Sequence, residues 1–129
     1  MTSTATEHLQ IARDYLDSIP EAKPRAGTDI YQPTLQSLAA ATKHLEAAAK
    51  TDPKATLTVD DPNTKQSTTH TLDELRSEAL YYEGFAHAHY GLSVSDVEKG
   101  VVAIQKAILH KPYSAIYHSQ LGYAFLRLG

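Results

Sequence analysis

A duplicated helical segment is the feature that most constrains this chain. Residues 84–91 and residues 122–129 share both flanking glycines, an alanine, an aromatic residue after the first glycine and a large apolar residue before the last. The copies lie 38 residues apart, and self-similarity at a fixed offset of about 20 to 50 residues is typical of stacked structural repeats. Because stacked repeats usually present binding surfaces, the duplication favours a protein–protein interaction role.

A second pattern links the ends of two expected helices. Each has an apolar residue, then an alanine three positions on and a proline five positions after that: Leu45, Ala48 and Pro53, then Ile104, Ala107 and Pro112. With Leu121-Gly122 and Phe125, these residues resemble the tetratricopeptide repeat (TPR) family. The resemblance covers a half-repeat near residues 38–53 and about one and a half repeats over 77–129. It implies an all-α fold, a TPR-like superhelix of about five antiparallel helices.

Length and composition fit one domain over residues 1–129. We expect an N-terminal helix pair over 4–53, an insertion over 54–70, and one and a half repeats over 71–129. The insertion breaks the helical pattern, since Leu57 and Val59 alternate with threonines before a turn sequence at residues 60–63. A short β-hairpin and a polar loop are both compatible with this pattern.

Helix boundaries follow from capping and apolar spacing. Three Ser/Thr-x-x-Glu capping boxes predict helix starts: Thr4–Glu7, Thr71–Glu74 and Ser95–Glu98. We expect Pro20 to end the first helix, residues 20–30 to form a loop and the second helix to begin near Pro33. Three apolar stripes predict buried faces: Ala5, Leu9, Ala12, Leu16 and Ile19; Leu35, Leu38, Ala41, Leu45 and Ala48; Val97, Val101, Ile104 and Ile108.

The third expected helix, residues 71–90, is apolar on almost every side, so one buried stripe cannot explain it. The TPR resemblance implies a groove lined by the first helix of each repeat. Mapped onto this chain, it implies a partner-binding set of Tyr81, Phe85, His89, Tyr123 and Arg127. Aromatic residues and arginine commonly anchor interfaces, and this set suits an apolar or aromatic peptide or helix. The alternative is that these rings pack between adjacent helices.

The last expected helix, residues 114–128, is also apolar on several faces. Large exposed apolar patches mark interaction sites, so self-association as a homodimer is the second functional hypothesis. The residues assigned to that interface are Ile116, Leu121, Phe125 and Leu128. The repeat assignment needs the two duplicated glycines, Gly84 and Gly122, because only a small residue lets the two helices of a repeat approach closely.

Other functional classes find little support in the sequence. Glu83, His87 and His118 could form a metal site, but packing histidines are the commoner explanation, and we expect no metal, cofactor or catalytic residue. The net charge of −3 gives no nucleic-acid footprint. The chain has no cysteine, no apolar run of membrane length and no secretory signal, so we expect a cytoplasmic scaffold with a protein or peptide partner and no membrane.

Overall fold

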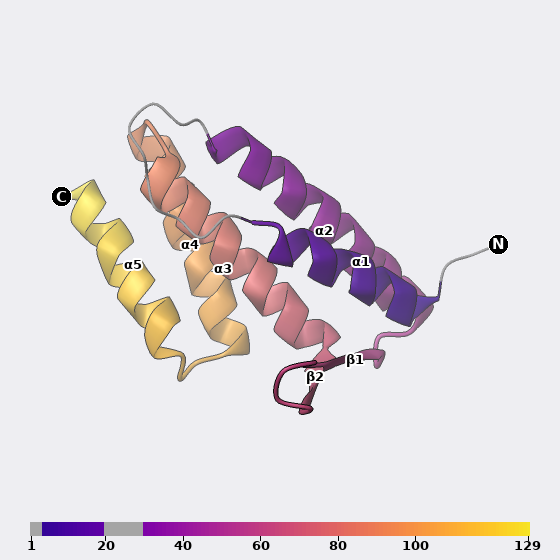
Figure 1. The fold of residues 1–129 in the computed structure, drawn as a ribbon. Helices are drawn as coiled ribbons and strands as arrows, with labels where there is room; N and C mark the ends of the chain where they lie inside the picture. The colour runs from indigo at the N-terminus through magenta and orange to yellow at the C-terminus, as the bar shows by residue number, and fades with distance from the viewer. Residues whose placement is uncertain (1–3, 20–29) are drawn as a thin grey trace.

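The computed structural model describes residues 4–19 and 30–129, which form five helices and a two-stranded sheet. The elements are, in order, α1 (Ala5–Asp17), α2 (Tyr31–Thr51), β1 (Thr56–Asp60), β2 (Ser67–Thr71), α3 (Leu72–Tyr90), α4 (Val94–His110) and α5 (Ala115–Leu128). Helices α1, α3 and α5 lie side by side in one layer, with α2 and α4 behind them (Figure 1). The prediction of an all-α fold is confirmed.

Local capping explains where the helices begin. Thr4 and Glu7 form the predicted capping box of α1, and the Thr71 hydroxyl accepts the Glu74 N–H at 3.1 Å to start α3. The predicted start of α4 is wrong by two residues, because the Ser93 hydroxyl rather than Ser95 caps the helix. The Asp96 carboxylate also accepts a hydrogen bond from the Leu92 N–H at 3.2 Å, and this bond stabilises a helix that begins at Val94.

The predicted second helix forms, and four of the five residues assigned to its buried stripe are buried: Leu38, Ala41, Leu45 and Ala48. It begins at Tyr31, two residues before Pro33, and Thr34 takes the inward position predicted for Leu35. Thr34 fits because it lies four residues before Leu38 on the same stripe, whereas Leu35 is half-buried at its edge. Pro20 and residues 20–29 of the expected loop lie outside the described residues; α1 itself ends at Asp17.

The insertion forms the hairpin, not the polar loop. Strands β1 and β2 pair antiparallel from Thr56↔Thr71 to Asp60↔Ser67. Leu57 is buried and Val59 half-buried against the core, while Thr56 and Thr58, which alternate with them, are exposed. The hairpin therefore closes one end of the layer formed by α1 and α3 (Figure 1).

Two groups of buried residues hold the helices together. The first lies between α1, α2, the hairpin and the first half of α3, and its most completely buried leucines are Leu9, Leu16, Leu45 and Leu75. The second joins α3, α4 and α5 through Ala88, Val97, Val101 and Ala124. Helix α3 contacts every other helix, which explains why its sequence is apolar on almost every side.

The two duplicated glycines have different surroundings. A Cβ at Gly84 would lie 2.9 Å from the Gly100 carbonyl oxygen and 3.0 Å from the Ile104 nitrogen, both backbone atoms of α4. A Cβ at Gly122 would meet no heavy atom within 4 Å. The prediction that both glycines permit close helix approach is therefore confirmed for Gly84 and wrong for Gly122, whose face of α5 is uncovered.

Candidate interaction site

Helices α3 and α5 bring the predicted partner-binding aromatics into one stack. Phe85 stacks on His89 with a ring-centroid distance of 4.0 Å, and His89 stacks on Tyr123 at 4.2 Å with an interplanar angle of 10°. Phe85 and His89 are half-buried, and Tyr123, the outer ring, is 39% exposed. These three residues are here called the aromatic stack. Most of the surface of Phe85 and His89 is covered by packing between α3 and α5, which was the alternative to a partner-binding role.

Polar contacts fix the aromatic stack from both sides. The His89 Nε2–H donates to the Gln120 side-chain oxygen at 2.8 Å, which orients the imidazole between the two rings. Arg127 donates from Nη1 to the Ala88 carbonyl oxygen at 2.6 Å. A cation at the carbonyl end of α3 interacts favourably with the helix dipole. Arg127 therefore anchors α5 to the end of α3, rather than being left free for a partner.

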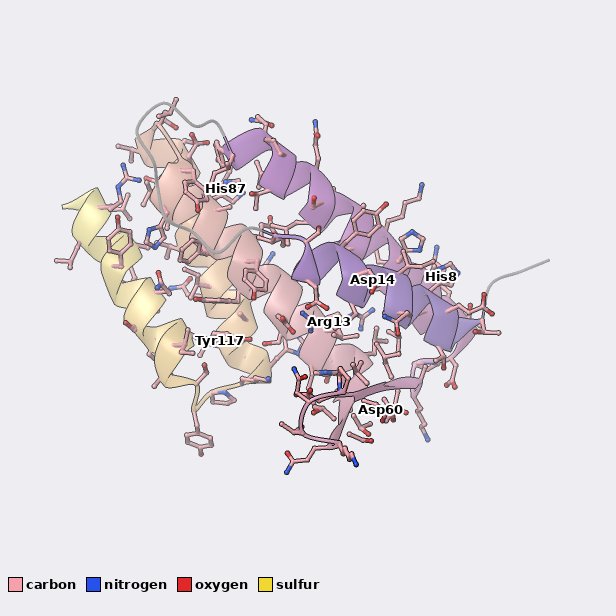
Figure 2. All side chains as sticks on the ribbon, in the orientation of Figure 1. His8, Arg13, Asp14, Asp60, His87 and Tyr117 are labelled. Atoms are coloured by element: carbon pink, nitrogen blue, oxygen red, sulfur yellow. The ribbon has the colours of Figure 1, made fainter. Side chains whose placement is uncertain are left out.

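Tyr81 belongs to a neighbouring contact between the same helices. Its ring stacks on Tyr117 at 4.8 Å with an interplanar angle of 22°, and the Tyr117 hydroxyl accepts from Ser77 at 3.0 Å. Burial raises the pKa of Tyr81 above its ordinary value. Tyr117 reaches from α5 toward α3 (Figure 2). Sequence reasoning did not connect Tyr117 with Tyr81, because the two residues lie on different helices.

An ion pair joins α3 to α1, on the side of α3 away from α5. Arg13 of α1 donates two hydrogen bonds to the Glu78 carboxylate, at 2.6 and 2.7 Å. This fork geometry is the strong form of an Arg–carboxylate pair. Arg13 lies between α1 and α3 (Figure 2), with its side chain only 11% exposed. Glu78 therefore serves to join α3 to α1.

The predicted self-association residues do not share one surface. Ile116 is 61% and Phe125 50% exposed, whereas Leu121 and Leu128 pack against the second buried group. Leu126, at 80% exposed, was not assigned to that interface. An all-round apolar helix does not show which residues face inward, so the sequence alone could not separate these two sets.

The possible Glu83, His87 and His118 metal site is not assembled. Glu83 Oε1 lies 3.9 Å from His87 Nε2, but His118 bonds to the Pro112 carbonyl oxygen at the start of α5. No group of three His, Cys, Asp or Glu residues that could hold a metal occurs in the described ranges. His87 Nδ1 instead lies 2.6 Å from the Tyr31 hydroxyl, and burial lowers the His87 pKa. His87 therefore acts as a packed, neutral histidine.

Three hollows that the sequence did not predict lie on the opposite side of α3, along α2 and α4. Their volumes are 390, 220 and 500 Å³, and Glu83 lines all three. Besides Glu83, both cationic and anionic side chains line them: Lys43, Glu46, Arg76, Glu98, Lys99 and Lys106. The walls of each hollow come from two or three different helices, so no pattern within one helix could have indicated them. The mixed charges favour no single class of ligand.

Comparisons with protein families, with curated proteins and with solved structures gave no match to this chain. None of the helices in residues 4–19 and 30–129 combines the length and the hydropathy that a membrane-spanning helix needs.

Proposed function

We propose that this chain is a protein-interaction module that binds an apolar or aromatic segment of another protein. The binding face is the layer of α1, α3 and α5, and its contact point is the aromatic stack of Phe85, His89 and Tyr123. The observation that carries the proposal is that Tyr123 stacks on His89, which is itself bonded to Gln120, and yet remains 39% exposed at the edge of the stack. A ring held in place before binding loses little conformational freedom when a partner packs on it.

The helix arrangement supports a TPR-like module. Helix α1 packs on α2 and α3 packs on α4, while α1, α3 and α5 also contact one another in sequence order. In a TPR-like module the first helix of each repeat lies in one layer and the second helix in the other, as α1, α3 and α5 do relative to α2 and α4. The family assignment, like a cytoplasmic location, stays a prediction.

Peptide selection tests the binding face directly. A display library of short random peptides, panned on the whole chain, should yield aromatic or apolar sequences that bind Tyr123→Ala at least about tenfold more weakly. Tyr113→Ala is the matched control, because Tyr113 is 98% exposed at the turn before α5 and lies outside the stack. Peptides that bind both variants equally, or a failure to enrich any peptide, would reject the aromatic stack as the contact point.

Self-association through α5 is the second candidate. Exposure of Ile116 and Phe125 on one helix favours it, because contiguous apolar side chains in water mark interfaces. The other two residues assigned to that interface, Leu121 and Leu128, pack against the second buried group. A homodimer would therefore bury a smaller surface of α5 than the sequence indicated.

A further inference from the structure

Two histidines meet where α1 packs on α2. His8 Nδ1 lies 2.9 Å from His44 Nδ1, and the ring centroids are 5.2 Å apart with the ring planes tilted by 35°. His8 lies on α1 beside α2 (Figure 2). Both side chains are half-buried, so part of each ring is reachable from solvent. The two residues lie 36 positions apart in the sequence, and for that reason no local ligand motif indicated them.

The core fixes the backbone on both sides of this pair. Leu9 and Leu45, which directly follow the two histidines, are 0% and 1% exposed and belong to the first buried group. The His44 ring is restrained further by Tyr15, which stacks on it at 6.2 Å with an interplanar angle of 21°. Ligands whose positions are fixed before binding lose little conformational freedom when an ion binds.

The separation of the two nitrogens suits two ligands of one metal ion. Zn–N bonds are about 2.0–2.1 Å long, so two imidazole nitrogens at about 90–110° on one ion lie about 2.9–3.4 Å apart. The observed separation of 2.9 Å is at the short end of this range. In the direct hydrogen bond one Nδ1–H donates to the other Nδ1; when both rings carry their proton on Nε2, both Nδ1 lone pairs are available to a cation. Imidazole nitrogen suits Zn²⁺, Cu²⁺ and Ni²⁺.

The nearby charged side chains do not oppose a cation at this point. Lys43 and Glu46, the charged residues nearest to His44 along α2, line the hollows on the α3 side of that helix. Arg13 of α1 is bonded to the Glu78 carboxylate of α3. Neither cation therefore faces the histidine pair, where a positive side chain would repel a metal ion.

We propose that His8 and His44 form a two-histidine site for Zn²⁺ or a similar late first-row divalent cation. Zn²⁺ is usually four-coordinate, so two positions on the ion stay available to water or to side chains of another protein. The proposal does not depend on partner binding at the aromatic stack. An ion held by both residues links α1 to α2 and stabilises the folded chain.

Isothermal titration calorimetry of the whole chain with ZnCl₂, in a buffer that does not bind zinc, tests the site. We expect one site per chain, with affinity at least about tenfold weaker in His8→Gln and in His44→Gln, because each removes one of the two ligands. His70→Gln is the matched control, since His70 lies 3.9 Å from the Glu74 carboxylate and forms a competing ligand pair. This control should bind Zn²⁺ as the original chain does.

Thermal unfolding supplies a second readout. Zn²⁺ should raise the unfolding temperature of the original chain and of His70→Gln but leave that of His8→Gln and His44→Gln unchanged. Far-UV circular dichroism checks that each variant folds, and either histidine variant decides the question if the other does not fold.

Three results would overturn the proposal. The first is the absence of Zn²⁺ binding by the original chain. The second is binding that stays unchanged in either His8→Gln or His44→Gln, because the ion would then not need both residues. The third is binding that is lost in His70→Gln, which would place the ion at the His70–Glu74 pair instead.

Discussion

Adding one methyl group at Gly84 tests whether close α3–α4 contact holds the fold together. Gly84→Ala places a Cβ against the Ile104 side chain and within 3.0 Å of two backbone atoms, the Gly100 oxygen and the Ile104 nitrogen. A side chain can turn aside, but backbone atoms can move away only if α4 shifts as a body. The substitution therefore separates the two helices along their whole contact.

Opposing effects set the size of the change. Replacing glycine by alanine inside a helix stabilises it by about 1 kcal/mol, because alanine has less conformational freedom to lose. Overpacking a tight core costs about 1–3 kcal/mol. We expect Gly84→Ala to lower the free energy of unfolding by about 1 kcal/mol overall, and Gly84→Leu to lower it by more.

Gly122→Ala is the matched control, since it has the same chemistry in the duplicated position without any neighbour within 4 Å. It should keep the helix-propensity gain and raise the free energy of unfolding by about 0.5–1 kcal/mol. Urea unfolding followed by circular dichroism measures both variants. If Gly84→Ala were as stable as Gly122→Ala, the close approach of α3 to α4 would be refuted.

Two further substitutions probe the contacts around α3. Glu78→Gln breaks the two-bond pair with Arg13 and should lower the free energy of unfolding by about 1–3 kcal/mol, as for buried charged hydrogen bonds. Asp17→Asn removes the other carboxylate that contacts Arg13. Because Asp17 is 64% exposed, this change should alter the free energy of unfolding by no more than about 0.5 kcal/mol. Equal effects of the two substitutions would show that the Arg13–Glu78 pair does not join α1 to α3. Burial lowers the His87 pKa below 6.5, so the unfolded chain takes up this proton first as the pH falls. Stability should therefore decline more steeply below about pH 6.5 in the original chain than in His87→Gln; parallel pH profiles from thermal melts would show that His87 does not titrate differently on folding.

The sequence predicted those parts of the fold that local interactions decide. Thr4 and Thr71 each stand three residues before a glutamate and begin helices as expected. The start of α4 could not be decided in this way. Both Ser93 and Ser95 precede an acidic residue by three positions, and the choice depends on how the chain leaves α3 at Gly91. A Cβ at Gly91 would collide with the His87 carbonyl oxygen, so the path of the chain at this residue requires glycine.

Contacts between helices were harder to predict than the helices themselves. The resemblance brought Phe85, His89 and Tyr123 into one set, and the structure stacks them. It did not indicate Gln120, because the rotation of α5 about its axis depends on packing against α3. The same rotation turns Leu121 and Leu128 inward and leaves Gly122 bare. An apolar pattern spread around a helix carries no information about that rotation.

The mass of the chain in solution, measured by light scattering after size exclusion over a concentration series, tests most directly whether α5 is free for another protein. We expect a monomer at every concentration, with the same mass for Phe125→Ala. A dimer that grows with concentration and is lost in Phe125→Ala would show that α5 binds a second copy of the chain, and would contradict a surface reserved for a different partner.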